Sequence, residues 1–286
     1  DGFAYNALNR LLGKDTNAPV LEIMGSQFCL KFHRDMICAI TGARLRAFLD
    51  GRSLNPWTSF SATAGSVLQV REVAEGLRYY VGFAGKMFLD CVIGCFSTNL
   101  ECRFGGYHGR SLSSGDQIDV DGIYNVSTGV IPDKVIPRMK SPHPLHITAG
   151  PEYQSFYEKS QKTFGDREFR TVYTVSESSN RTGIRLEGQQ LAFRADVDKS
   201  IVSEGILPGT VQIPGDGLPI IMLYERTIGG YARIGRVIRA DMDRLAHLKP
   251  GDYVLFEKIE IADAERLWQE RQNKLSSLAN IVRRLP

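Results

Sequence analysis

The chain has 286 residues, of which 43% are hydrophobic and 23% are charged, and its formal net charge is +3. These values are typical of a folded globular protein that is long enough for two domains. No apolar run reaches the roughly 18 to 20 residues that cross a bilayer. Because the basic clusters are also short, we expect neither a membrane protein nor a nucleic-acid-binding protein.

An amphipathic helix is predicted at the start of the chain. Residues Phe3 to Leu12 place their apolar side chains with the i, i+3, i+4 spacing of a helix, and Gly13 follows as a stop signal. A second helix is predicted near the other end, where Asp263 can cap a helix that runs to about Arg284. We expect both helices to pack onto the β structure between them.

The cysteines favour a reduced, cytoplasmic setting, because their number, five, is odd and no signal peptide precedes them. Cys91, Cys95, Cys102 and His108 are close in sequence, but their spacings match no common zinc pattern. Since a free cysteine behaves as a small hydrophobic residue, we expect buried thiols and assign no metal site.

The middle of the chain is predicted to be β structure, because short strand-like runs alternate with turn residues. Two stretches recur in the same order: Gly65–Val70 resembles Gly209–Ile213, and Ser114–Ile118 resembles Pro250–Val254. These short matches leave open whether the two halves are related β domains or similar by chance.

A charged, proline-rich segment at 131–144 is the expected linker between the halves. His143 and His146 flank Pro144, and we expect them in a solvated loop. The predicted organisation is a first β domain, a second β domain and a C-terminal helix, at residues 1–130, 145–262 and 263–286.

The segment from Ser203 to Tyr231 is unusual, because glycines, prolines and charged residues recur there between strand-like runs. Such glycines suit turns with positive φ or the close approach of a ligand or another chain. Asp216 lies between two glycines, where its carboxylate can act as a base, bind a metal–nucleotide complex, or hydrogen-bond its own turn, which is the default. Tyr231 follows Gly229 and Gly230, and we favour a core position over ring stacking.

Long ordered motifs in this chain resemble the biotin-dependent carboxyltransferase family. That family includes the C-type subunit of bacterial 5-oxoprolinase, allophanate hydrolase subunit 2 and the carboxyltransferase part of urea carboxylase. In the second half, the motifs lie at Val175–Gly188, Ser203–Pro219 and Arg226–Tyr231. In the first half, they are Leu21-Glu-Ile, Thr41-Gly-Ala, Gly51-Arg, Gly65-Ser, Gly105-Gly-Tyr-His-Gly-Arg-Ser-Leu and Gly115-Asp.

Three features depart from the family pattern. Family members begin with a strand and a further segment before the first helix, and we expect that this first strand is missing here. Glu225-Arg226 stands where relatives have Asp-Arg, and Gly94–Thr98 lacks the arginine that is often beside Ser97. Roles transferred to Glu225 and Ser97 are therefore the weaker part of the resemblance.

The resemblance implies a mainly β fold of two tandem cyclophilin-like β-barrel domains with short flanking helices. It also implies work with a B-type subunit of related fold and an A-type hydrolase subunit, which together open 5-oxo-L-proline to L-glutamate with ATP and magnesium. The chain has no phosphate-binding loop of the Gly-x-x-x-x-Gly-Lys-Ser/Thr type and no kinase signature, so any nucleotide contact uses another arrangement.

Candidate site residues follow from the chemistry that the resemblance implies. Guanidinium groups suit a carboxylate and a developing oxyanion, which favours Arg181, Arg185 and Arg226. Arg181 and Arg185 lie on one face if their segment is a regular strand, and Gly183 between them leaves room for a ligand. The catalytic candidates are Arg226, Asp216 and Glu225. The substrate-binding candidates are Ser176, Ser179, Asn180, Arg181, Arg185, Gly229, Gly230 and Tyr231.

Three functions remain open at this level. The first is the C-type subunit of 5-oxoprolinase, which we expect to be inactive alone. The second is a carboxyltransferase that uses carboxybiotin, for which another protein must carry the biotin because this chain has only Arg138-Met-Lys-Ser141. The third is a noncatalytic antagonist of a protein that inhibits a histidine kinase.

Overall fold

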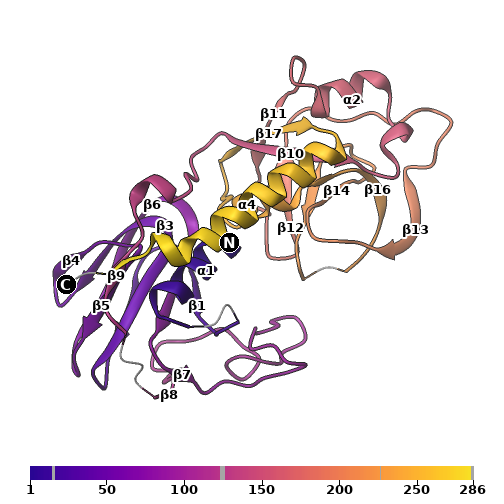
Figure 1. Ribbon diagram of the computed structural model, residues 1–286. Helices are drawn as coiled ribbons and strands as arrows, with labels where there is room; N and C mark the ends of the chain where they lie inside the picture. The colour runs from indigo at the N-terminus through magenta and orange to yellow at the C-terminus, as the bar shows by residue number, and fades with distance from the viewer. Residues whose placement is uncertain (15–16, 123–125, 226, 285–286) are drawn as a thin grey trace. The chain divides into compact units, whose positions relative to one another are not determined.

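Two compact units make up the protein in this computed structural model, which describes residues 1–14, 17–122, 126–225 and 227–284 (Figure 1). The first unit comprises Asp1–Arg138 and Lys274–Pro286, and the second comprises Met139–Asn273. Within the described residues, each unit contains one eight-stranded sheet. The expectation of a mainly β fold with two β domains in tandem is confirmed.

The first unit is built on two long antiparallel strands, β3 (Met36–Leu49) and β6 (Val67–Phe83). Their register shifts next to Gly42, whose φ is +104°. A Cβ atom there would lie 2.7 Å from the backbone of Arg78 and Tyr79, so only glycine allows this approach. The other elements are α1 (Gly2–Leu11), β1 (Leu21–Met24), β2 (Phe28–Lys31), β4 (Arg52–Leu54), β5 (Thr58–Ala62), β7 (Lys86–Met87), β8 (Val120–Asp121), β9 (Gly129–Val130), the 3-10 turn η1 (Asp133–Val135) and β18 (Arg283–Arg284).

Helix α1 forms where the periodicity predicted it. The Asp1 side chain caps it by accepting a hydrogen bond from the Ala4 amide at 2.9 Å. Its apolar stripe packs on the sheet so closely that a Cβ at Gly82 would lie 2.4 Å from Leu8. The buried cluster around the helix also contains Leu278, which lies near the end of α4 (Ile261–Ile281). The predicted cap residue of α4, Asp263, lies inside its first turn.

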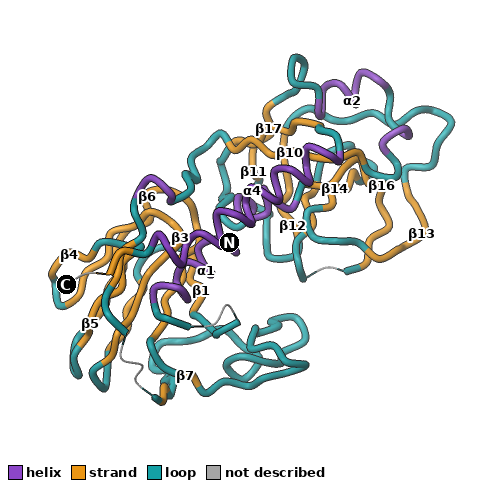
Figure 2. The backbone as a smooth tube through the Cα atoms, viewed as in Figure 1, coloured by secondary structure: helices purple, strands orange, loops and turns teal. Residues whose placement is uncertain are grey.

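Residues 88–119 form a long segment that is drawn mostly as loop in Figure 2. It packs backbone against backbone, since a Cβ at Gly109 would lie 2.1 Å from the Arg103 carbonyl oxygen. The prediction of buried thiols here is wrong, because Cys91, Cys95 and Cys102 are all exposed. Backbone bridges such as Asp90 with Gly106, together with the ion pair of Arg110 with Asp116, connect parts of this loop.

The second unit contains a closed seven-stranded barrel. Its strands run in the order β10-β17-β11-β12-β15-β14-β16, and β16 pairs with β10 to close the ring, while β13 adds to β16 outside it. The strands are β10 (His143–Ala149), β11 (Val172–Val175), β12 (Gly183–Glu187), β13 (Ser200–Gly205), β14 (Thr210–Ile213), β15 (Ile220–Met222), β16 (Ile228–Val237) and β17 (Tyr253–Lys258). The helical pieces are η2 (Tyr153–Ser155), α2 (Glu158–Gly165), η3 (Arg239–Asp241), α3 (Met242–Leu245) and α4.

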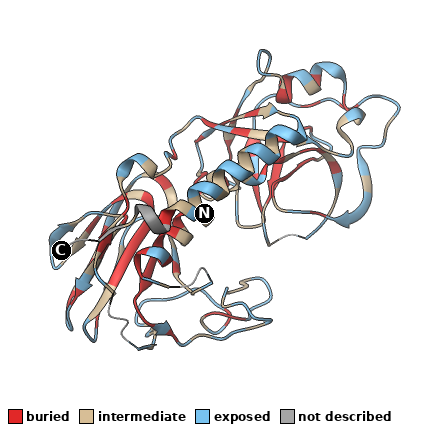
Figure 3. Cartoon of the chain, in the orientation of Figure 1, coloured by how far each residue is buried: buried red, intermediate tan, exposed pale blue. Residues whose placement is uncertain are grey.

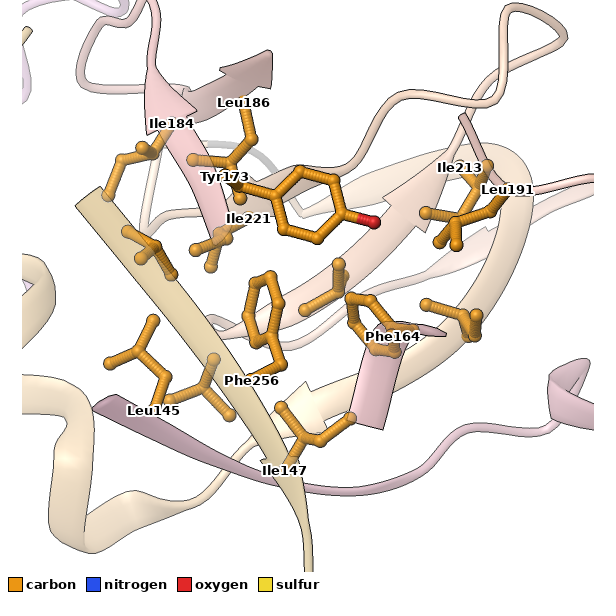
Figure 4. Close-up of a cluster of buried hydrophobic side chains, with 14 of the residues drawn as sticks. Leu145, Ile147, Phe164, Tyr173, Ile184, Leu186, Leu191, Ile213, Ile221 and Phe256 are labelled. Atoms are coloured by element: carbon orange, nitrogen blue, oxygen red, sulfur yellow. The ribbon is translucent and has the colours of Figure 1, made fainter. Parts of the chain in front are cut away.

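Aromatic rings fill the interior of the barrel (Figure 4). The ring centroids of Phe164 and Phe256 lie 4.5 Å apart, and Tyr173 packs edge-on against Phe256 at 5.9 Å. The Tyr173 hydroxyl donates to the Gln189 carbonyl oxygen at 3.2 Å, so its polar end is satisfied. Burial alternates along β10 and β17, whereas every residue of β14 and β15 is buried. Figure 3 shows exposed residues along β13 outside the ring.

The sequence repeat corresponds to repeated turns. Gly65 and Gly209, which begin the first matched pair of stretches, have φ values of +92° and +85°. Gly115 and Gly251, in the second pair, have φ values of +92° and +83°. The two matches therefore mark four turns that need glycine, which explains why these residues recur.

The prediction of a linker at 131–144, with His143 and His146 in a solvated loop, is partly wrong. His143, Pro144 and His146 belong to strand β10, where they pair in parallel with β17, and His143 is fully buried. Proline is tolerated because β16 pairs only with Ile147–Ala149, so at Pro144 the strand is paired with β17 alone and its other edge needs no N–H donor.

We expect Phe256→Ala to lower the free energy of unfolding of the second unit by about 3–5 kcal/mol, because it leaves a cavity among packed rings. Denaturant titration followed by circular dichroism measures the change. The matched control is Phe169→Ala, whose side chain is 61% exposed and which we expect to change stability by less than about 0.5 kcal/mol. Equal losses in the two variants would contradict this account of the core.

Candidate functional site

The candidate residues gather mainly where β11, β12 and β15 meet two irregular segments. Residues 176–182 connect β11 to β12, and residues 223–225 follow β15. The Leu223 amide donates to the Thr182 carbonyl oxygen at 2.9 Å, and Gly183 pairs with Met222 in the sheet. The two segments are therefore neighbours at one end of the barrel wall.

Polar side chains in the 176–182 segment hold its own backbone. Asn180 Oδ1 accepts hydrogen bonds from the amides of Thr182 at 2.9 Å and Gly183 at 3.2 Å. Ser179 Oγ accepts from the Arg185 amide at 3.0 Å, and the Ser176 hydroxyl donates to the Glu187 carboxylate. Ser176, Ser179 and Asn180 thus shape the turn, which leaves fewer of their polar atoms for a ligand.

An ion pair joins the two segments. Arg181 Nε donates to Glu225 Oε1 at 2.7 Å, and the side chains of Arg181 and Glu225 are 41% and 19% exposed. Arg181 precedes β12, so the argument that placed it on one strand face with Arg185 is wrong. Glu225 neutralises much of its charge and fixes the direction of its guanidinium group.

Arg185 has a different environment. It lies on β12 between the buried residues Ile184 and Leu186, so its side chain points out of the barrel, opposite Ile220 on β15. Among the described residues, its guanidinium group has no hydrogen-bond or ion-pair partner. Arg185 is thus available to an anion, whereas Arg181 is held by Glu225.

Asp216 lies apart from these residues. It precedes β15, whereas Glu225 follows that strand, and a strand rises ~3.3 Å per residue. Its carboxylate accepts a hydrogen bond from the Leu218 amide at 3.0 Å, which is the turn role. The structure therefore does not bring Asp216 together with Arg181 and Glu225.

The glycine pair lies at the start of β16. Gly229 pairs with Glu204 on β13, and Tyr231 pairs with Ser200. The expectation that Tyr231 closes the core is wrong, because it is 45% exposed. Arg226, the remaining catalytic candidate, lies outside the described residues.

A charged cluster on β16 was missed by sequence reasoning. Arg233 donates to both carboxylate oxygens of Glu152, at 2.8 Å from Nε and 2.7 Å from Nη2, and to Glu204 at 3.0 Å. The Arg233 guanidinium lowers the pKa of the Glu152 carboxyl, chiefly through the side-chain hydrogen bonds. Glu152 and Arg233 are 81 positions apart, and neither lies in a recognisable motif. No local signal in the sequence connects them.

The pKa values of two histidines on β10, His143 and His146, are shifted in opposite directions. Burial lowers the pKa of His143, whose Nε2 lies 3.4 Å from Asp252 Oδ2 without hydrogen-bond geometry. The hydrogen bond to Asp241, 2.7 Å from His146 Nδ1, raises the pKa of His146. His143 therefore favours the neutral form in the folded state, and His146 favours the charged form.

Within the described ranges, no group of three or more histidine, cysteine, aspartate or glutamate side chains is arranged to hold a metal ion. In those same ranges, no helix has the length and apolar character to cross a membrane.

Solved structures share this architecture. The urea amidolyase of K. lactis superimposes with a TM-score of 0.87 at 23% identity, and the match covers 97% of this chain and 18% of that protein. This chain thus spans less than one fifth of the length of that structural relative. At this identity the likeness establishes the fold.

Sequence comparison identifies the class. The C-type subunit of 5-oxoprolinase from Escherichia coli is 34% identical over 279 residues, which cover 96% of this chain and 86% of that protein. The urea amidolyase of Saccharomyces cerevisiae is 24% identical across 97% of this chain and 16% of its own length. Residues 1–258 match the family of the carboxyltransferase domain, subdomains A and B, and the chain belongs to that family.

The two histidines predict opposite dependences of stability on pH. His146 has a raised folded-state pKa, so its contribution is complete below the unfolded value of 6.5 and is lost as pH rises through the folded value. His143 has a lowered folded-state pKa, so stability falls as pH drops below 6.5. We expect the stability loss caused by His146→Gln to shrink between roughly pH 5 and pH 9.

Relative to wild type, His143→Gln should weaken the loss of stability on acidification. Urea titrations at each pH measure both effects. Parallel pH profiles of the two variants and the wild type would show that neither histidine changes its protonation on folding in the way described.

Proposed function

We propose that this chain is the C-type subunit of an ATP-dependent 5-oxoprolinase, which converts 5-oxo-L-proline to L-glutamate. The observation that carries the proposal is the 34% identity to the C-type subunit of E. coli, which extends over 96% of this chain. In this proposal the chain works with a B-type subunit of related fold and an A-type hydrolase subunit, and it is inactive alone. The five free cysteines fit a reduced, cytoplasmic setting.

The substrate has a carboxylate and a lactam carbonyl, and attack on that carbonyl places negative charge on its oxygen. A guanidinium group can bind either anion with two parallel hydrogen bonds. Arg185 supports the proposal best, because it is exposed beside the 176–182 segment and has no partner among the described residues. We assign it to the substrate carboxylate, and we assign Arg226 to the carbonyl oxygen.

Arg181 and Glu225 have a supporting role in this scheme. Their ion pair links the 176–182 segment to the segment that leads into β16, so it sets the separation of the groups on either side. ATP, with magnesium, supplies the energy for ring opening in the assembled complex, and no residue of this chain is assigned to it. Asp216 is left out of the catalytic group, because it lies at the other end of β15.

A carboxyltransferase that uses carboxybiotin is the second candidate. The similarity to S. cerevisiae urea amidolyase, 24% identical across 97% of this chain, favours it. Biotin enters only under this alternative, and another protein would carry it.

We expect the chain, mixed with its B-type and A-type partners, ATP, magnesium and 5-oxo-L-proline, to release L-glutamate above the level of the partners alone. Arg185→Ala should lower kcat/KM by about 10- to 100-fold, because a charge-assisted hydrogen bond is lost. The control is Arg194→Ala, since Arg194 pairs with Asp196 elsewhere on the unit. A coupled glutamate assay gives the rates.

Failure of the wild-type mixture to exceed the partner-only control would refute the proposed activity. Urea-dependent carboxylation in the presence of a biotinylated carrier would instead establish the second candidate. If the chain binds a partner but neither reaction occurs, the antagonist function becomes the remaining explanation.

A further inference from the structure

We infer that Gln212 is a positioning residue that sets the geometry of the Gly229-Gly230-Tyr231 segment. The inference rests on the proposed function, because it concerns how the substrate-binding side of this chain is held in place. Gln212 lies on β14, and the segment that it contacts begins β16.

The contact is direct. Gln212 Nε2 donates a hydrogen bond to the Tyr231 carbonyl oxygen at 3.3 Å. The same amide group lies under Gly229, where an added Cβ would be 2.3 Å from Nε2 and 2.9 Å from both Cδ and Oε1. One side-chain amide thus touches the first residue of the segment and binds the last.

Gln212 is held firmly enough to act in this way. It is 2% exposed, although its side chain is polar, and its neighbours Val211 and Ile213 both belong to the apolar core of the barrel. A buried amide is stable only with its hydrogen bonds intact. Gln212 therefore has little freedom to move away from the segment above it.

Position 229 requires glycine for a steric reason. Its φ lies outside the left-handed region, so conformation does not require glycine there. The requirement comes from the amide, because a methyl group would occupy the space of Gln212 Nε2. Displacing the amide would also break its bond to Tyr231.

The segment bears on the substrate directly, because Gly229, Gly230 and Tyr231 are themselves substrate-binding candidates. β16 starts at Ile228, directly after the residues that contain Glu225, the partner of Arg181. The Thr227 carbonyl oxygen accepts from the Ile206 amide at 2.8 Å, which ties the same turn to the segment after β13. Thr227 and the start of β16 are thus held by contacts with Ile206, β13 and β14.

The test uses four variants in the full complex with both partner subunits: Gln212→Glu, Gln212→Ala, Gly229→Ala, and Gly229→Ala combined with Gln212→Ala. Gln212→Glu keeps the shape but replaces the donor with an acceptor that faces the Tyr231 carbonyl oxygen. We expect its KM for 5-oxo-L-proline to rise about 10-fold, while kcat changes less than about 2-fold and partner association is unchanged.

Gln212→Ala removes the donor and should raise KM by a similar factor, and Gly229→Ala should do the same by displacing the amide. The double variant should be no worse than Gln212→Ala alone, because the methyl group then has room and no further contact is lost. Gln269→Glu is the matched control, since Gln269 is exposed on α4, and its kinetics should equal those of the wild type.

Additive losses in the double variant, or an unchanged KM in Gln212→Glu with an active wild type, would overturn the inference and leave the proposed function standing. An inactive wild-type complex would instead overturn the proposed function. In that case amide hydrogen exchange at 228–231 decides: faster exchange in Gln212→Glu supports the positioning contact, and unchanged exchange refutes it.

Discussion

The pairing of β10 with β16 is the interaction on which the second unit depends. Ile147, Thr148 and Ala149 pair with Val237, Arg236 and Gly235, and this ladder turns an open path of strands into a ring. Closure removes two sheet edges and encloses the apolar cluster around Phe256. One end of β16, Gly235–Val237, pairs with β10, and the other end, Ile228–Tyr231, extends beyond the ring and pairs with β13.

In the barrel, the residues that form the core are different from those assigned to substrate binding. Side chains that point inward make the core, whereas Arg185 faces outward on β12, and Arg181 and Glu225 lie beyond the ends of β12 and β15. Arg181 and Arg185 illustrate the division within one segment: the first has a fixed partner in Glu225, and the second has none among the described residues. A rigid ring thus presents one restrained and one available guanidinium group from adjacent parts of the chain.

Local patterns in the sequence predicted what depends on local physics. The spacing of Phe3 to Leu12 predicted α1, and the glycines of the matched stretches mark real turns. Prediction from the sequence failed where the structure depends on contacts between residues that are far apart in the chain. Nothing near Pro144 reveals that β17 will pair with its strand, and the partnership of Arg233 with Glu152 exists only after closure. For the candidate site, the motifs pointed to the segments around β12, β15 and β16, but the exposure of Tyr231 and the separation of Asp216 required the three-dimensional fold.

Helix α4 has a consequence for how the protein can be divided. The first unit contains Asp1–Arg138 and also Lys274–Pro286, so it is assembled from two separated parts of the chain. Leu278 contributes a fully covered side chain to the cluster around α1. A fragment that ends at Arg138 would expose the apolar surface that Leu278 covers. The two units are therefore not interchangeable modules: the first folds completely only after the ribosome has finished the second.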